Sequence, residues 1–498
     1  MSMGVRPYAR RGRRRVDLLR APVLGRFLRW RHARTTMQTL LLLLAVLVIY
    51  DGLTGPALAS QNLAGVLPWV HWRGLVVLAL LVIGNVFCAA CPFMLPRRLA
   101  KRLLPANRPW PRWLANKWLA IGLVALFFWA YESFDPWASP QLTAWLVLAY
   151  FVAAAIVDGL FKGAAFCKYV CPIGQFNFVN SLMSPVEVAV RRPNTCAGCV
   201  TKDCIAGRRL PLAAAASRPL PVSQAWQAGC ETWLFQPRKI GNMDCTFCLD
   251  CVQACPHDNV GLLARTPGAE LWNETHRSSI GRLDQRPDLA ALVLVLVFAA
   301  FLNALGMVRP VYALERWLAE RLSTDSEPLV LLVLFGGGLI VVPILLAGLT
   351  ASISRALVGE RESIVTVASR FSYALAPLGL GMWLAHYQWH FFTGLLTVVP
   401  VVQAFLADHG LPLLGTPRWE LGPVMPSAWL LPIEAVFLDA GLLGAVVVAY
   451  RIGRRHYQAR ERAVRAAAPW MLLAIGLFLF GIWLMLQPME MRGTGLSA

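Results

Sequence analysis

Long apolar runs recur along this chain, and they constrain its fold more than any other feature. A run of about 20 apolar residues can cross the hydrocarbon core of a bilayer as a helix. Hydrophobic residues make up 57% of the chain and charged residues only 15%, whereas soluble proteins are about 25% charged. These figures exclude a disordered chain, a collagen-like chain and an ordinary soluble enzyme. The sequence therefore predicts an all-α polytopic membrane protein.

The apolar runs predict about nine transmembrane helices. They are Thr39–Ala59, Leu75–Cys91, Trp118–Phe134, Leu142–Phe161, Leu289–Val308, Leu329–Thr350, Phe371–Phe391, Trp429–Tyr450 and Trp470–Leu486. The stretch Thr393–Leu406 is also apolar, but it is 14 residues long and contains Pro400. That length suits an interfacial or re-entrant segment better than a span.

The alternation of apolar and polar stretches predicts four parts. Residues 1–35 form a basic cytoplasmic arm, and residues 36–184 form a four-helix transmembrane domain. Residues 185–288 are polar and rich in Cys, Pro and Arg, and only this segment is large enough for an extramembrane domain. Residues 289–498 form a C-terminal transmembrane domain of about five helices with an outer loop at 392–428.

The net charge of +20 indicates how the chain lies in the membrane. Its basic excess is concentrated within residues 1–34, 97–117 and 451–465, and basic residues stay on the cytoplasmic side. With nine spans and the N-terminus inside, all three runs and the cysteine-rich segment are cytoplasmic, and the C-terminus is periplasmic. Anionic lipids would hold the runs at the membrane surface. The charge therefore predicts topology and contact with membrane lipid, not a nucleic-acid partner.

The start of the chain has a second interpretation. An Arg-rich segment, an apolar run and then Ala57-Leu58-Ala59 also fit a signal peptide with a small-residue cleavage site. The long basic arm and the length of the apolar run favour an uncleaved span. Cleavage would leave the orientation of every later span unchanged.

Eight of the twelve cysteines lie between Cys196 and Cys255, and their spacing predicts iron–sulfur ligation. Cys245, Cys248, Cys251 and Cys255-Pro256 follow the bacterial ferredoxin pattern for a [4Fe–4S] cluster. In two-cluster ferredoxins the fourth cysteine of this pattern ligates the other cluster. A zinc site is the alternative, although zinc sites usually pair two distant Cys-x2-Cys units.

A less regular motif precedes it and completes a two-cluster arrangement. Exchange of the fourth cysteine predicts that two sets of four cysteines hold two [4Fe–4S] clusters. One set is Cys196, Cys199, Cys204 and Cys255, and the other is Cys230, Cys245, Cys248 and Cys251. The alternative is one cluster together with a zinc ion or spare thiols.

Two more cysteine pairs end transmembrane segments at the cytoplasmic face. Cys88 and Cys91 precede Pro92, and Cys167 and Cys171 precede Pro172, so the chain contains an internal repeat. Spacings of three and four place each pair on one helical face. Three interpretations remain open: a further metal centre, redox-active dithiols, or structural cysteines at helix ends.

These motifs resemble the membrane-bound polyferredoxins of the NosR/NapH type. That family has C-x3-C-P motifs at membrane helix ends, followed by a cytoplasmic ferredoxin module with two [4Fe–4S] clusters. The resemblance covers roughly residues 36 to 290 and implies electron transfer in the bacterial inner membrane, with quinone and redox proteins as partners. The chain departs from the family in its first pair, which is C-x2-C-P, in lacking a large periplasmic flavin domain, and in about 200 additional C-terminal residues.

Two histidines lie within one predicted span. His386 and His390 are four residues apart, which places both rings on one helical face. Ionisable residues within a membrane are candidates for function, and imidazole can bind a metal or exchange protons with a quinone. The alternative is an interfacial belt with Tyr387 and Trp389.

The sequence therefore predicts an integral membrane iron–sulfur protein that acts as an electron-transfer component of an oxidoreductase system. It would relay electrons between a quinone or cytoplasmic donor and a membrane or periplasmic redox partner. The alternative is a maturation or metal-handling factor, for example one that reduces copper for assembly of a respiratory metalloenzyme. A third possibility is a transporter or scaffold whose clusters sense redox state. The donor, the acceptor, the direction of electron flow and the oligomeric state stay open.

Overall fold

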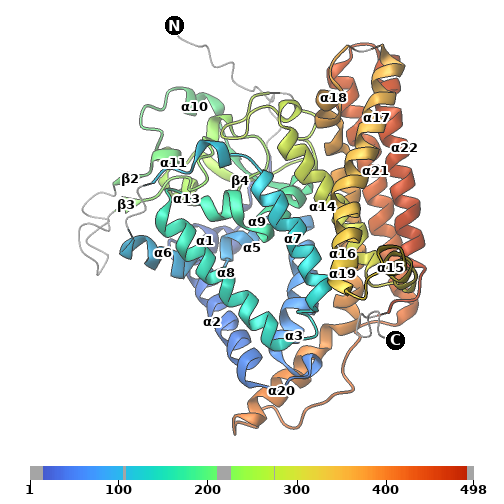
Figure 1. The fold of residues 1–498 in the computed structure, drawn as a ribbon. Coiled ribbons are helices and arrows are strands. Elements are labelled where there is room, and N and C mark those ends of the chain that lie inside the picture. Colours follow the sequence, from blue (N-terminus) through green and yellow to red (C-terminus); the bar gives the residue numbers. More distant parts are fainter. Residues whose placement is uncertain (1–14, 105–107, 210–225, 274, 360, 491–498) are drawn as a thin grey trace.

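The computed structural model shows a mostly helical molecule (Figure 1). It describes residues 15–104, 108–209, 226–273, 275–359 and 361–490. Part of the predicted basic arm, residues 1–14, lies outside the described residues.

Eight helical segments of the described chain are long and apolar enough to cross a membrane. They are α2 (Ala33–Thr54), α3 to α4 (Leu63–Val82), α8 (Pro140–Leu160), α14 (Pro287–Leu305), α16 to α17 (Glu327–Val358), α18 to α20 (Ile364–Asp408), Ser427–His456 and α22 (Arg460–Met485). A shorter apolar helix, α7 (Trp118–Phe134), has 17 residues and a length of about 26 Å. The structure thus confirms a polytopic helical membrane protein, with helices near all nine predicted spans.

Several of these segments consist of successive α-helices joined by short 3-10 or π-helical turns. The components are α3 (Leu63–Val66), α4 (Arg73–Val82), α16 (Glu327–Gly336), α17 (Val342–Val358), α18 (Ile364–Phe371), α19 (Ala376–Gly394), α20 (Val398–Asp408) and α21 (Leu430–His456). Helix α20 covers residues 398–406 of the predicted interfacial stretch Thr393–Leu406, whose first two residues belong to α19, and it packs against α3.

Helix α14 forms the centre of the bundle. The protein buries 89% of its apolar window, against 22–44% in the other seven segments. Trp383 of α19 donates a hydrogen bond from its indole nitrogen to the Leu296 carbonyl of α14, at 3.1 Å. In Figure 1, helices α2 to α8 lie on one side of α14 and α19, and α16, α17, α21 and α22 lie on the other. The outer helices therefore keep apolar faces available for lipid.

The cysteine-rich segment folds at one end of the bundle (Figure 1). Strand β1 (Val186–Val190) pairs antiparallel with β4 (Val260–Ala264), and β2 (Arg208–Arg209) pairs with β3 (Trp226–Gln227). Most cysteines of this segment lie in three short helices or next to them. The helices are α10 (Pro193–Ala197), α11 (Asp203–Ala206) and α13 (Asp250–Ala254). The β1–β4 pair joins the two ends of this segment, so the intervening chain forms one unit.

The described part of the basic arm is not a free extension. Asp17 forms an isolated bridge with Leu263 of β4, and its carboxylate pairs with Arg191 at 2.7 Å. Arg15 reaches Glu187 of β1 at 2.5 Å. The described part of the arm therefore packs on the cysteine-rich segment through Arg15 and Asp17 and is followed by α1 (Leu24–Arg29).

The second span differs from its prediction. The helix ends at Val82 and not at Cys91, because Gly84 adopts φ +84°, a left-handed conformation that breaks the helix. A separate short helix, α5 (Val86–Ala90), then carries Cys88 and is capped by Asn85, whose side-chain oxygen accepts the Cys88 amide at 3.4 Å.

The predicted surface role of the basic run 97–117 is also wrong at its two ends. Arg97 of α6 (Met94–Leu103) and Lys117 are each 1% exposed. Arg97 pairs with Asp158 at 2.9 Å, and Lys117 pairs with Asp244 at 2.6 Å. These two cations neutralise buried carboxylates and do not contact lipid headgroups.

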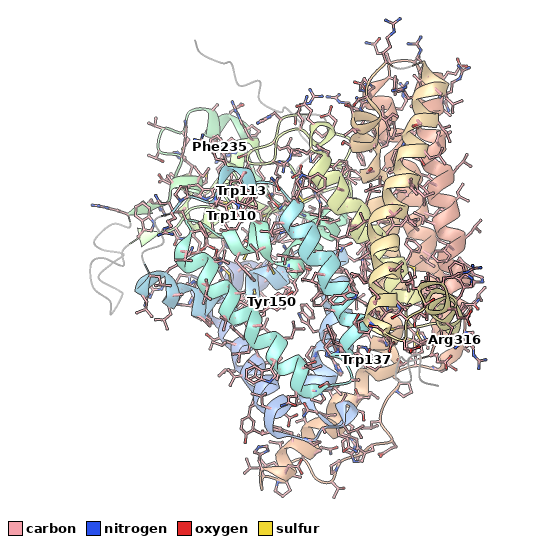
Figure 2. All side chains as sticks on the ribbon, viewed as in Figure 1. Trp110, Trp113, Trp137, Tyr150, Phe235 and Arg316 are labelled. Carbon is pink, nitrogen blue, oxygen red and sulfur yellow. The ribbon has the colours of Figure 1, made fainter. Side chains whose placement is uncertain are left out.

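The basic run 451–465 can be placed relative to the cysteine-rich segment. Arg370 and Ile452, which border the turns at the ends of α18 and α21, line a pocket together with Leu271 of the cysteine-rich segment. The helix α15 (Arg309–Leu322) lies toward the opposite end, as Arg316 and Phe235 show in Figure 2. The basic run 451–465 and the cysteines therefore share one end.

Candidate metal centres

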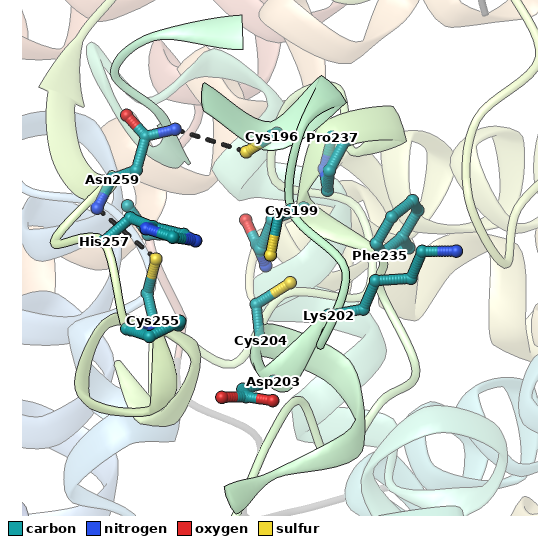
Figure 3. A pocket seen from close by; sticks show the side chains of 13 residues that line it. Cys196, Cys199, Lys202, Asp203, Cys204, Phe235, Pro237, Cys255, His257 and Asn259 are labelled. Atoms are coloured by element: carbon teal, nitrogen blue, oxygen red, sulfur yellow. Dashed lines mark hydrogen bonds between the residues drawn. The ribbon is translucent and has the colours of Figure 1, made fainter. Parts of the chain in front are cut away.

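Four cysteines from two helices and a turn face one pocket at the surface of the cysteine-rich segment (Figure 3). We call Cys196, Cys199, Cys204 and Cys255 the outer thiol group. Its pocket has a volume of about 370 Å³, part of which is open to solvent. Asn259 donates from its side chain to the Cys196 sulfur at 3.2 Å and from its backbone to the Cys255 sulfur at 3.4 Å. This is the set that the ferredoxin exchange predicts for one cluster.

A second set lies deeper. We call Cys230, Cys245, Cys248 and Cys251 the inner thiol group. Cys230, the least regular member of the motif, interacts electrostatically with each of the other three. Phe247 and Leu249 adopt φ of +54° and +59°, so the chain turns tightly between the cysteines. The Phe247 amide donates a hydrogen bond to the Cys245 sulfur at this turn.

One helix connects the two groups. Cys251 lies in α13 and Cys255 caps its end, so consecutive cysteines of one motif enter different groups. The Cys230 amide also donates to the Cys204 carbonyl at 3.0 Å. These two links keep the outer and inner thiols adjacent, which is the layout expected of a two-cluster ferredoxin module.

Burial makes free thiolates unfavourable at both groups. It raises the pKa of Cys204 to about 11, and neighbouring thiols of the outer group raise it further. Burial likewise raises the pKa of Cys245 and Cys251. A thiolate ligand is stable in such a place when a metal lies beside it.

The spacing of the thiols does not match a single metal ion. No three His, Cys, Asp or Glu side chains in the described ranges lie close enough to hold one. Zinc binds thiolates at about 2.3 Å in a tetrahedron, which requires closely packed sulfurs.

The two pairs at the helix ends form a third group of thiols. We call Cys88, Cys91, Cys167 and Cys171 the membrane-face thiol group. Cys91 and Cys171 each interact electrostatically with Cys167 and Cys88. Cys167 lies in a π-helical turn, Phe166–Val170, and Cys171 caps both that turn and α9 (Pro172–Asn180). Segments nearly 80 residues apart in the chain therefore bring their cysteines to one place.

Ion pairs fill the space between the inner and membrane-face groups. Arg97 contacts Asp158, Glu231 and the Cys167 sulfur, the last at 3.9 Å. Arg34 of α2 pairs with Asp250 at 2.5 Å and with Glu231 at 3.8 Å. Arginine beside thiolates and clusters compensates their negative charge. Sequence reasoning missed Arg97 because the adjacent basic residues gave it the appearance of a surface charge.

His386 and His390 lie buried in α19, with exposures of 0% and 8%. Their ring centroids are 5.1 Å apart, and both nitrogens of His386 lack a hydrogen-bond partner in the structure. This burial contradicts the interpretation as an interfacial belt. Within the described chain no further His, Cys, Asp or Glu completes a metal site with them. The guanidinium of Arg73 lies 4.9 Å from the Tyr387 ring beside them.

Comparison with protein-family models, curated proteins and solved structures finds no match to this chain. The assignment of a function therefore depends on the residues and their geometry.

Proposed function

We propose that the protein is an integral membrane electron-transfer protein with two [4Fe–4S] clusters held by the outer and inner thiol groups. One observation supports this most: eight cysteines with ferredoxin-like spacing form two sets of four that share α13. Each cluster would take up and release one electron at a time. Proteins of the NosR/NapH type, which the motifs resemble, have this chemistry.

The surroundings of the two groups support opposite roles. The outer group lines a pocket that is open to solvent, with Lys202 and His257 at its wall. A cytoplasmic redox protein could approach this side. The inner group is more buried and lies toward α5 and the membrane, because Asn85 donates to the Cys245 carbonyl at 3.0 Å. The protein thus offers a path from its cytoplasmic end toward the bilayer.

A chain of aromatic rings continues from this region to the histidine pair. The ring centroids of Phe176 in α9 and Trp383 are 5.1 Å apart, and those of Trp383 and Tyr387 are 5.0 Å apart. Tyr387 is 5.5 Å from His386. A quinol oxidised near this pair would release two electrons and two protons, and the unbonded His386 nitrogens could accept a hydrogen bond from the quinol hydroxyl. We therefore favour a quinol as the membrane partner.

The alternative role in metal handling needs a metal site at the histidines. His386 and His390 contact each other edge to face but have no third ligand within the described chain. Electron transfer with a quinol requires no such ligand, so the geometry favours it.

Anaerobic purification with iron and sulfide counting and EPR of the reduced protein tests the proposal. We expect at least eight irons and eight sulfides per chain and the signals of two interacting clusters. Cys199→Ser and Cys248→Ser should each remove one signal, whereas Val200→Ala, at an 89% exposed position beside Cys199, should leave both. A full complement of zinc in place of iron in freshly prepared protein would refute the proposal.

A further inference from the structure

The membrane-face thiol group is built symmetrically from two similar chain segments. Helix α5 and the turn Phe166–Val170 each end in a cysteine followed by proline. Cys91 and Cys171 therefore occupy equivalent positions at helix ends, and Pro92 and Pro172 stop each helix there. Each of the two short segments ends before a proline and contributes two cysteines. The four thiols lie near one another.

Each of the four sulfurs accepts a hydrogen bond from an N–H group. The Asn177 side chain donates to Cys88 at 3.3 Å, and the Gly174 amide donates to Cys171 at 3.2 Å. Arg97 donates to Cys167 at 3.9 Å. The Phe93 amide donates to Cys91. Donors directed at every sulfur are typical of thiolate ligands, whose metal centres are adjusted by such bonds.

The charges around the group leave room for a bound cation. Asp158 and Glu231 pair with Arg97 and offset much of its positive charge. Soft thiolate ligands select iron–sulfur clusters, zinc or copper(I).

The group also lies beside the inner thiol group. Cys88 interacts electrostatically with Cys245. Asn85 joins the two directly, since its oxygen accepts the Cys88 amide and its nitrogen donates to the Cys245 carbonyl. On the other side, Asn177 is the neighbour of Phe176, which begins the aromatic contacts toward His386. The four thiols therefore lie between the inner group and the membrane helices.

We propose that Cys88, Cys91, Cys167 and Cys171 ligate a third iron–sulfur cluster at the membrane face. The inference extends the proposed electron transfer and assumes that the outer and inner groups carry clusters. A cluster is the metal centre that would carry electrons on from the inner thiol group, which Asn85 joins to Cys88. Asn177 and Arg97 are the positioning residues that donate to its ligands.

Iron and sulfide counting on anaerobically purified full-length protein tests the proposal. Three four-iron clusters predict about twelve irons and twelve sulfides per chain. The quadruple variant C88A/C91A/C167A/C171A should retain about eight of each, together with the EPR signals of the outer and inner clusters. The variant V200A is the control and should keep about twelve.

The outcomes separate this inference from the proposed function. About eight irons in the wild-type chain, unchanged in the quadruple variant, would overturn the third cluster and leave the two-cluster protein intact. One zinc or copper per chain, lost in the quadruple variant, would also overturn it. Fewer than eight irons in both proteins would refute the proposed function itself.

A milder variant covers the case in which the quadruple variant does not fold. Asn177→Leu removes the donor to Cys88 and leaves all twelve cysteines in place. We expect its iron content to stay near that of the wild type. The potential of one cluster signal should shift, because a hydrogen bond to a ligand sulfur stabilises the reduced state. An unchanged set of potentials would contradict a cluster at this position.

Discussion

Arg97 is the residue on which the charges of the membrane face converge. Its guanidinium contacts two carboxylates and one thiol while only 1% exposed. Removal of one partner from a buried ion pair leaves an uncompensated charge and typically costs about 3–5 kcal/mol. The structure therefore makes strong predictions for the residues around it.

Glu231→Gln should destabilise the protein substantially. The carboxylate pairs with both Arg97 and Arg34, and its side chain is 20% exposed, so we expect a loss of about 2–4 kcal/mol. Glu461→Gln is the control, because its exposed pair with Arg465 contributes less than about 1 kcal/mol. Thermal unfolding in detergent, followed by size-exclusion chromatography, measures both. Equal effects of the two substitutions would contradict the buried network.

Glu187 should contribute stability that depends on pH. Lys239, Arg265 and Arg15 lower its pKa although burial opposes the shift. A lowered pKa in the folded state means that the contribution is present above about pH 4.5, the usual pKa region of Glu. It is lost as the pH falls through the folded value.

We therefore expect Glu187→Gln to lower the unfolding temperature at pH 7 by an amount that corresponds to about 1–3 kcal/mol. The difference from the wild type should stay constant down to about pH 5 and shrink as the pH falls below about 4.5. Unfolding temperatures at pH 7, 5 and 3 measure this. A difference that does not change with pH would show that the carboxylate charge is not responsible.

His386→Leu should leave the fold stable, because neither ring nitrogen forms a hydrogen bond that would be lost. Removal of unbonded buried polar atoms is neutral or stabilising by about 1 kcal/mol. We expect quinol-driven reduction of the clusters to slow at least tenfold, since the ring nitrogens that could hold the quinol are lost, while reduction by dithionite is unchanged. His409→Gln, at an exposed position, is the control. Normal quinol kinetics in H386L would exclude the histidine pair from the reaction.

At the scale of elements, short breaks between helices position the thiols. Gly84 ends the second span early, and this break allows α5 to turn Cys88 toward Asn177. A β-carbon at Gly84 would lie 2.8 Å from the Phe247 ring and 2.9 Å from the Ser184 hydroxyl oxygen. The element that carries one cysteine pair is therefore packed directly on the loop of the inner thiol group.

Gly84→Ala should consequently destabilise the protein by about 1–2 kcal/mol, through both the positive φ and the contact with Phe247. Gly122→Ala in α7 is the matched control, because a β-carbon there meets no atom within 4 Å. We expect the control to be neutral or more stable by up to about 1 kcal/mol. Thermal unfolding compares the two, and a G84A protein as stable as G122A would refute the strained break.

The sequence predicts long elements better than short ones. Apolar runs predict the bounds of α8 and α14 to within three residues, because a bilayer requires a fixed length of apolar helix. The sequence predicts that the second span ends at Cys91, nine residues beyond the observed helix end at Val82. Apolar residues continue past Gly84, so hydropathy does not mark the break, and only the packing of Phe247 against it does.

At the scale of the whole molecule, the thiol groups follow one another from the solvent-exposed pocket toward the membrane helices. The outer group joins the inner group through α13, and Asn85 joins the inner group to the membrane-face group. The C-terminal helices enclose α14 and α19 with the histidine pair. They shield the buried polar residues of α19 from lipid.

The arrangement predicts opposite outcomes for two reporter fusions. A fluorescent protein fused after Gln458, in the turn between α21 and α22, should fluoresce, because this turn shares an end with the cysteines. The same reporter fused after Ala498 should be dark, and alkaline phosphatase at that site should be active, if nine spans place the C-terminus in the periplasm. Fluorescence at both sites would contradict nine spans.

Composition and periodicity alone determined the helical membrane class and the pairing of cysteines into sets, because bilayer thickness and ligand spacing are local constraints on sequence. Only the tertiary structure decided that Arg97 and Lys117 are buried partners of carboxylates, that Cys88 and Cys167 lie together, and that His386 is enclosed by protein. These facts arise from contacts between distant segments. A buried charge is stable only when such a partner is present, and the residues next to the charge in the sequence do not indicate where that partner lies.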